Sequence, residues 1–371
     1  MSKIERVEVR LINLIPPVKR TDAIQSFISQ ETPIIRIYDD QGAIGTGYCY
    51  TIGVGGHAVV DILQRHLCPQ LIGRDPVYIE EIWHDLLFYS HATSVGPIMS
   101  LSLAAIDIAL WDLRCINAGE PLHVLAGGAQ HDLTLYTTEG GWLHIETKDL
   151  VTDALRAKAE GFSGSKVKVG RPHISEDIER LRAVREAVGP AYEIMVDANQ
   201  AFQPDEAIRR AAQYESLDLA WFEEPMPADD LTGHIRLSSS TCLPIAVGES
   251  LYSLGQFREY MTMNACSVVQ PDVARVGGIT PWLKIAHMAE GFNLPICPHF
   301  LMEIHVSLVA AVPNGRWIEY IPQLESITQS GIRIKDGRAF PSSKPGLGIE
   351  WDWDKITHMQ NSQNNPVFNV K

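Results

Sequence analysis

Short hydrophobic runs recur along the chain from about residue 130 onward, and each run ends at a polar residue that precedes an amphipathic helical stretch. The runs are rich in β-branched and aromatic residues, as β-strands are. Between two of them, Leu181, Val184 and Val188 recur at helical spacing. Strands that alternate with helices build parallel βαβ units, and eight such units close an α/β barrel of the (β/α)₈ type. The eight predicted strands are residues 133–140, 165–170, 192–199, 219–225, 244–250, 266–272, 294–299 and 315–320.

The first 125 residues follow a different pattern. Residues 4–14 and 32–50 are typical of antiparallel strands, the second interrupted by the turn sequence DDQG, and helical segments are expected at 59–68, 78–88 and 101–116. This predicts an α+β domain over residues 1–126, a Gly-rich linker at 126–132, and the barrel over 127–345. We expect the segment 346–371 to pack back on the N-terminal domain, with 345–356 strand-like and the residues after Asn361 loosely held.

Composition and charge narrow the class of protein. The chain has 371 residues, 45% of them hydrophobic and 20% charged, which is typical of a globular protein with a sizeable core. The net charge of −14 argues against a nucleic-acid partner. Asp107 interrupts the best apolar run, so we expect no membrane partner. The N-terminus lacks a secretory pattern and the six cysteines are scattered, which predicts reduced thiols and a cytoplasmic location.

Ionisable residues lie at the ends of seven successive predicted strands. They follow one another at intervals of 20 to 29 residues, about one βα unit each. Active sites of barrels form at the carboxyl ends of the strands, so these side chains are expected to meet in one mouth. A charged strand end is unremarkable by itself, but three consecutive carboxylates between a lysine and a histidine are not. The residues are Lys168, Asp197, Glu223, Glu249, Asp272, His299 and Glu319.

Asp197, Glu223 and Glu249 come from three adjacent strands. Three carboxylates this close repel one another unless a cation lies among them. Because oxygen ligands without Cys or His favour a hard metal, we expect one Mg²⁺ per subunit. Glu224 follows Glu223 directly, and spacing alone leaves the choice between them open, although the equal intervals of 26 residues favour Glu223.

Two candidate bases flank the expected metal site. Lys166 and Lys168 alternate on one strand and face the same way, and two adjacent ammonium groups are expected to lower the pKa of one, which makes it a base near neutral pH. Asp272 can hold one ring nitrogen of His299 and raise the basicity of the other. Glu319 could bond a substrate oxygen. Two lysines on a solvated face are common elsewhere, but not inside a barrel.

These parts indicate proton abstraction next to a carboxylate, which gives an enediolate. Re-protonation on the opposite face is racemisation or epimerisation, whereas loss of a β-hydroxyl, with His299 as the proton donor, is dehydration. Competing motifs do not fit: the glycines at 53–56 lack the third glycine of a dinucleotide fingerprint, and the chain has no Walker, HExxH or GxSxG sequence.

At these residues the chain resembles the enolase superfamily, and within it the mandelate racemase subgroup. The resemblance covers nearly the whole chain, including the IDIALWD segment at 106–112 and the PGLGIE tail. It implies a modified (β/α)₇β barrel whose mouth is closed by an N-terminal capping domain, and a homo-oligomer of two to eight subunits. It also implies that Lys168 and the pair His299–Asp272 are the bases, that Lys166 and Glu319 bind the substrate carboxylate, and that the metal ligands are Asp197, Glu223 and Glu249. Asn199 matches a contact to a substrate hydroxyl.

The resemblance implies a substrate class as well. Members with this full set mostly dehydrate sugar acids, and segments such as 138–142 look similar to talarate/galactarate dehydratases, while GTGYCYT looks equally like sugar-acid cycloisomerases. We therefore predict a lyase acting on a small carboxylate, with a racemase, epimerase or cycloisomerase as the alternative and a non-catalytic ligand-binding barrel as a remote one. Arg20, Glu139 and Arg275 are the candidate residues for substrate choice.

Overall fold

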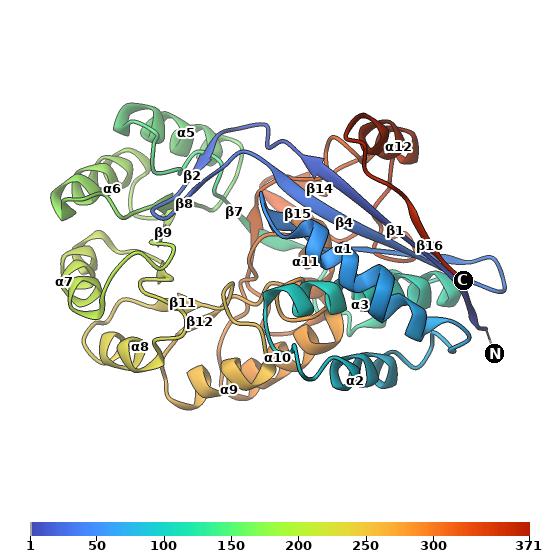
Figure 1. Cartoon of the computed structure of the whole chain (residues 1–371). Coiled ribbons are helices and arrows are strands. Elements are labelled where there is room, and N and C mark those ends of the chain that lie inside the picture. The colour runs from blue at the N-terminus through green and yellow to red at the C-terminus, as the bar shows by residue number, and fades with distance from the viewer. Residues whose placement is uncertain (1) are drawn as a thin grey trace.

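A computed structural model describes residues 2–371 (Figure 1). The N-terminal part is an antiparallel sheet in the order β16-β1-β4-β5, with β6 also paired to β4. Helices α1 to α3 pack on this sheet and on one another, and together with it they form what we call the capping domain. Its elements are β1 (Ile4–Leu14), β4 (Gln30–Asp39), β5 (Ile44–Tyr48), β6 (Thr51–Ile52), β16 (Phe368–Val370), α1 (Gly56–Ile62), α2 (Ile79–Tyr89) and α3 (Pro97–Ala118).

A two-stranded hairpin, β2 (Arg20–Thr21) and β3 (Ser26–Phe27), reaches from the capping domain over the barrel near β8 (Figure 1). The amide of Leu143 donates to the carbonyl of Thr21 at 2.8 Å, which ties the hairpin to the barrel. The predicted helix at 59–68 begins earlier, as α1, and continues through the turns η1 (Leu63–Leu67) and η2 (Cys68–Leu71).

Helix α3 is the central support of the capping domain. It begins at Pro97 and ends at Gly119, which takes a left-handed conformation suited to a helix C-cap. Strand β5 passes so close that a Cβ at Gly45 or Gly47 would lie 2.2 Å from a carbonyl oxygen of the helix, so only glycine fits there. Asp107 interrupts its apolar sequence. Across residues 2–371, none of the helices is both long and apolar enough to cross a membrane.

The second part is a parallel barrel, as predicted. The strands pair in the order β7-β8-β9-β10-β11-β12, and β13 pairs β7 from the other side. Ile296 bridges Val269 and Gly315, so the predicted strand at 294–299 is reduced to one bridging residue that closes the ring. The barrel strands are β7 (Leu133–Thr137), β8 (Gly164–Lys168), β9 (Glu193–Asp197), β10 (Trp221–Glu223), β11 (Ile245–Val247), β12 (Val268–Val269) and β13 (Trp317–Tyr320).

Seven helices of the barrel follow its first seven strand positions, and no barrel helix follows β13. The barrel is therefore a (β/α)₇β barrel. They are α5 (Thr147–Ala159), α6 (Ile174–Val188), α7 (Pro204–Tyr214), α8 (Leu231–Ser238), α9 (Leu254–Thr262), α10 (Ile279–Gly291) and α11 (Met302–Ala311). The short elements α4 (Leu122–Leu125) and η3 (Glu215–Leu217) and the hairpin β14 (Arg333–Lys335) and β15 (Arg338–Phe340) complete this part.

The C-terminal segment differs from the sequence prediction in two ways. Residues 353–362 form helix α12 (Trp353–Ser362) and not a strand, because the Asp352 carboxylate caps the helix by accepting from the amide of Lys355 at 3.0 Å. The residues after Asn361 are not loose, since β16 pairs with β1 over Val7 to Val9.

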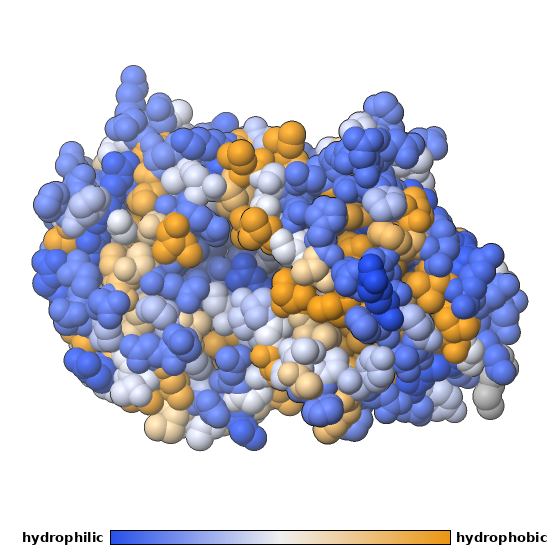
Figure 2. All heavy atoms as spheres, viewed as in Figure 1, coloured by the Kyte–Doolittle hydropathy of each residue, from blue (hydrophilic) through white to orange (hydrophobic). Residues whose placement is uncertain are grey.

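Inward-facing side chains fill the barrel below its mouth. Tyr136, Trp221 and Trp317 pack there edge-to-face, with Trp221 2% exposed. Met195 and Cys297 belong to the same cluster, and we call these five residues the barrel floor. Figure 2 shows a hollow near the centre of the face it displays, with hydrophilic residues in its depth.

Candidate functional site

Strand register brings the predicted ionisable residues to one level of the barrel. Lys168 pairs with Asp197 across β8 and β9, and Asp197 pairs with Glu223 across β9 and β10. Glu249 follows β11 by two residues, and Glu319 lies within β13. Each floor residue such as Trp221 precedes a site residue by two positions, so both point inward and the site lies directly above the floor.

Asp197, Glu223 and Glu249 form a buried cluster of carboxylates. One oxygen of each lies within 4.8 Å of the others. Burial, together with the charge of Asp197, raises the pKa of Glu223 to about 7. Oε2 of Glu249 has no hydrogen-bond partner among the described residues, although Nε2 of His299 lies 3.3 Å away. An all-oxygen donor set with an unpartnered buried oxygen fits a hard divalent cation such as Mg²⁺.

Glu224 lies outside this cluster. Its backbone takes a positive φ of 38° at the turn after β10, and its side chain is buried. Burial raises its pKa well above the usual value, and the nearby charge of Glu249 adds to this. The group of carboxylate oxygens that could hold one metal ion contains Glu223 and not Glu224, which favours Glu223 as the equal intervals do.

The two lysines lie among these carboxylates. Nζ of Lys168 is 2.5 Å from Oδ2 of Asp197. Nζ of Lys166 lies 2.8 Å from both Glu223 and Glu319. Burial and the charge of Lys166 lower the pKa of Lys168, but Asp197 and the other carboxylates outweigh them, so that its pKa is raised. The expected decrease is not found for these side chains alone, because the surrounding carboxylates, which the sequence argument did not count, favour the ammonium form.

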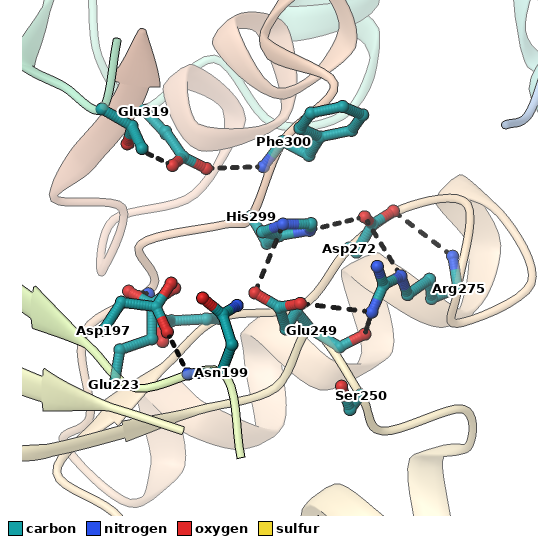
Figure 3. A network of polar contacts seen from close by, with 12 residues as sticks. Asp197, Asn199, Glu223, Glu249, Ser250, Asp272, Arg275, His299, Phe300 and Glu319 are labelled. Carbon is teal, nitrogen blue, oxygen red and sulfur yellow. Dashed lines mark hydrogen bonds and ion pairs between the residues drawn. The ribbon is translucent and has the colours of Figure 1, made fainter. Parts of the chain in front are cut away.

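His299 and Asp272 form the expected pair (Figure 3). Nδ1 of His299 lies 2.8 Å from Oδ2 of Asp272, which leaves Nε2 directed toward Glu249. Although burial raises the pKa of Asp272, its hydrogen bond to His299 lowers it to about 2, so it is a carboxylate at neutral pH. Burial lowers the pKa of His299, but Glu249 and Asp272 outweigh it, so that the pKa of His299 is raised. The imidazole is therefore held in one orientation with a raised basicity.

Several neutral residues that the sequence analysis missed complete the site. The Thr138 hydroxyl donates to Oε1 of Glu319 at 2.6 Å. Nε1 of Trp221 and Nε2 of Gln270 both donate to Oε2 of Glu223, at 2.9 and 2.8 Å. Strand alternation could have found Trp221 and Gln270, since each precedes a site residue by two positions. The Tyr50 hydroxyl donates to Oδ2 of Asp272 at 2.6 Å, and no local pattern points to it.

The residues predicted for substrate choice lie in two groups at the mouth. Arg20, 1% exposed, forms an ion pair with Glu139 and donates to the carbonyl of Pro322 at 2.9 Å. Arg275 donates to the carbonyl of Glu249 at 2.9 Å and lies 3.3 Å from its carboxylate. Both guanidinium groups thus already have protein partners.

Asn199 lies beside the carboxylate cluster (Figure 3). Its backbone amide nitrogen donates to Oδ1 of Asp197 at 2.8 Å, and its side chain takes no part in that hydrogen bond. Its side-chain oxygen is buried and has no hydrogen-bond partner within residues 2–371. An unpartnered amide oxygen at the mouth suits a hydroxyl donor.

Comparison with known proteins identifies relatives over the full chain. Residues 6–127 match the mandelate racemase / muconate lactonizing enzyme N-terminal domain, and residues 149–355 match the enolase C-terminal domain-like family. L-talarate/galactarate dehydratase of Salmonella typhimurium is 37% identical over 85% of this chain and 79% of its own. The 3,6-anhydro-alpha-L-galactonate cycloisomerase of Streptomyces coelicolor is 35% identical over 95% of this chain and 98% of its own.

A solved structure extends the likeness to three dimensions. The crystal structure of the Salmonella typhimurium dehydratase, liganded with Mg and L-lyxarohydroxamate, superposes with a TM-score of 0.93 at 33% identity and covers 100% of this chain and 94% of that one. Both domains of the fold thus have counterparts in that enzyme, whose structure is liganded with Mg. The chain belongs to the mandelate racemase / muconate lactonizing enzyme family of the enolase superfamily.

Proposed function

We propose that the protein is a Mg²⁺-dependent acid-sugar dehydratase, which removes the proton α to a carboxylate and eliminates the β-hydroxyl to give a 2-keto-3-deoxy acid. The observation that carries this proposal is the placement of two bases at one buried carboxylate cluster, with Lys168 on Asp197 and His299 next to Glu249. The similarity to an enzyme named as a talarate/galactarate dehydratase supports the same reaction.

Asp197, Glu223 and Glu249 would hold the Mg²⁺, which supplies positive charge beside the substrate carboxylate and so stabilises the negative charge that develops there. With the cation held by these carboxylates, their charge would favour the ammonium form of Lys168 less. Its burial and its neighbour Lys166, which both lower its pKa, would then count for more.

The side chains divide the reaction between them. Nζ of Lys168 takes the α-proton, and the electron pair moves into the carboxylate to give an enediolate. Lys166 donates to that carboxylate, and Glu319 is held beside it by the Thr138 hydroxyl. His299 donates its Nε2 proton to the β-hydroxyl, which departs as water, and the resulting enol becomes the ketone. General acid–base help of this kind contributes about 10²–10⁴ in rate.

The polar mouth supports a polyhydroxylated substrate. The unpartnered Asn199 side chain would accept from a hydroxyl near the carboxylate. Arg20 with Glu139, and Arg275 at Glu249, would contact the groups further along the chain of the sugar acid. Such groups present donors and acceptors but little apolar surface, which disfavours an aromatic hydroxy acid.

The second candidate function is a cycloisomerase or epimerase that uses the same enediolate. It is favoured by the match to a 3,6-anhydro-alpha-L-galactonate cycloisomerase over 98% of that enzyme's length. Two bases at opposite ends of one cluster can also return a proton to the other face of the substrate. A non-catalytic barrel, in contrast, would exchange no α-proton at all.

The test is incubation of the protein with Mg²⁺ in D₂O and a panel of sugar acids, including galactarate, L-talarate, galactonate and arabinonate. Keto acid is measured with semicarbazide and deuterium uptake by NMR. We expect keto acid from at least one compound, lost in Lys168→Ala and His299→Ala. Deuterium uptake without keto acid would instead favour the isomerase. The absence of both keto acid and deuterium uptake would contradict the proposal.

Two further properties stay predictions from the sequence, namely a homo-oligomeric state and a cytoplasmic location. All six cysteines are free thiols, which supports a reducing compartment. Gel filtration with light scattering measures the number of subunits directly.

A further inference from the structure

Tyr50 connects the capping domain to the catalytic pair of the barrel. It lies between β5 and β6 and is 2% exposed. Its hydroxyl donates to Oδ2 of Asp272 at 2.6 Å and accepts from Nε of Arg275 at 3.0 Å. Because a guanidinium group can only donate, the phenol proton has one remaining direction, toward Asp272. The contact therefore has a defined polarity.

The same carboxylate oxygen serves His299. Nδ1 of His299 lies 2.8 Å from Oδ2 of Asp272, while Oδ1 of Asp272 accepts from the amide of Ala274 at 2.8 Å. The ring of Phe300 contacts both as well, since it stacks on His299 at 5.3 Å and lies tilted against Tyr50 at 4.6 Å. Tyr50 thus contacts both the carboxylate that orients the imidazole and the ring that packs on it.

Lys168 has a different support. Its side chain contacts Asp197, and its backbone amide donates to the carbonyl of Gly141 at 2.8 Å. Neither partner contacts Tyr50 through a hydrogen bond. The Tyr50 contact therefore supports the His299–Asp272 pair and not Lys168.

We propose that Tyr50 is a positioning residue for the His299–Asp272 pair, so that the half of the reaction performed by His299 depends on this contact with the capping domain while the half performed by Lys168 does not depend on Tyr50. Without the phenol oxygen, Nε of Arg275 loses its partner. Oδ2 of Asp272 is 3.9 Å from that nitrogen, close enough for Arg275 to move in and compete with His299 for it. The inference rests on the proposed function, in which the two bases act in separate steps.

The test compares Tyr50→Phe with a matched control, Tyr48→Phe. Tyr48 lies two residues earlier in the chain and is also buried, but its hydroxyl has no hydrogen-bond partner among residues 2–371. Both variants remove one buried phenol oxygen, so the control reports any general cost of the change. Both are assayed as Mg²⁺-loaded full-length protein, on the sugar acid that the unmodified enzyme converts.

We expect kcat for keto-acid formation to fall about 10-fold to 100-fold in Tyr50→Phe, with KM within about threefold, because a misplaced acid slows only the proton delivery to the leaving group. In D₂O the α-proton is still removed by Lys168, and the enediolate returns to substrate more often. The ratio of α-deuterium in recovered substrate to keto acid should therefore rise by about the same factor, while Tyr48→Phe matches the unmodified enzyme.

Three outcomes would overturn the inference. If both variants keep the unmodified kcat and exchange ratio, the Tyr50 contact has no part in the reaction. If kcat falls in Tyr50→Phe but the exchange ratio does not change, the loss is a general structural one that affects both bases alike. If the unmodified enzyme neither eliminates water nor exchanges the α-proton on any compound of the panel, the proposed function itself fails, and the inference fails with it.

Discussion

The buried carboxylates at the barrel mouth differ in their partners from those along helix α3. Asp107 on α3 accepts from the amide and hydroxyl of Thr280, at 2.9 and 2.6 Å. Asp112, also on α3, accepts from the amides of Thr46 and Leu347, at 2.8 and 2.7 Å. Each α3 carboxylate thus joins segments that lie far apart in the sequence.

The pKa values alone do not separate the two regions. Burial raises the pKa of Asp107 to about 7 and that of Asp112 to about 6, and burial likewise raises that of Glu223 at the mouth to about 7. What differs is convergence: the mouth carboxylates face one another and leave an oxygen of Glu249 unpartnered, whereas those of α3 are apart and fully engaged. The convergence of the mouth carboxylates, and not their pKa values, therefore distinguishes the candidate site from the structural carboxylates of α3.

The largest expected effect separates the regions by their response to metal. Asp197→Asn should lose at least 10²-fold in activity, because it removes a ligand and the partner of Lys168. In the unmodified protein, Mg²⁺ at about 100 times its Kd should add about 2.7 kcal/mol of stability. Thermal melts with and without Mg²⁺ measure this gain, which Asp197→Asn should lack.

Asp112→Asn is the matched control for that experiment. It changes a carboxylate that is also buried but does not belong to the cluster, so it should keep the Mg²⁺-dependent rise in melting temperature. A normal Mg²⁺ response in Asp197→Asn, or a lost response in Asp112→Asn, would mean that the metal site is not the one described.

Removal of a carboxylate from α3 should damage stability and spare chemistry. Asp107→Ala leaves the amide and hydroxyl of Thr280 buried without their acceptor, which should cost about 3 kcal/mol. Urea denaturation measures this cost, and kcat of the folded fraction should stay within about threefold of the unmodified value. A stable but inactive variant would contradict the division between the two regions.

The smallest expected effect is the pH dependence that Asp107 contributes to stability. Its pKa rises from about 3.8 in the unfolded chain to about 7 in the folded protein, so the folded state binds an extra proton between these values. The stabilisation is complete below pH 3.8 and is lost as the pH rises through 7. Between pH 5 and pH 8 the loss amounts to about 2 kcal/mol.

Asp107→Asn should not show that loss, because an amide does not titrate. The free energy of unfolding of each protein, measured by urea denaturation at pH 5 and pH 8, gives the comparison. An equal change in both proteins would assign the pH dependence to other groups.

Most of the site could be predicted because its residues obey one rule of barrel geometry. Lys168, Asp197 and Glu223 end strands, and parallel strands bring their ends to one level. The rule says nothing about contacts between domains, so Tyr50, more than 200 residues from Asp272 in sequence, stayed hidden. Nor does it sum charges, and so it did not show that the carboxylates around Lys168 raise its pKa against the lowering by burial and by Lys166.

The tail was misread for a local reason. Trp351 and Trp353 alternate with polar residues, which is typical of a strand, yet the side chain of Asp352 caps a helix. Ile356 and Gln360 are the buried residues of that helix and lie four apart, a helical spacing that the sequence already contained. Alternation with period two over four residues favours a strand, whereas the cap at Asp352 favours the helix that forms.

The aromatic floor of the barrel makes the reaction chamber blind-ended. Tyr136, Trp221 and Trp317 close the chamber directly beneath the carboxylates. The entering acid, the released water and the keto acid therefore all pass through one opening, the one over which the hairpin with Arg20 lies. Substrate cannot enter from the floor side while product leaves through the mouth. Substrate and product must therefore use the same opening in turn. At saturating substrate, the rate of their exchange through this opening sets an upper limit on the turnover rate, however fast the bases work.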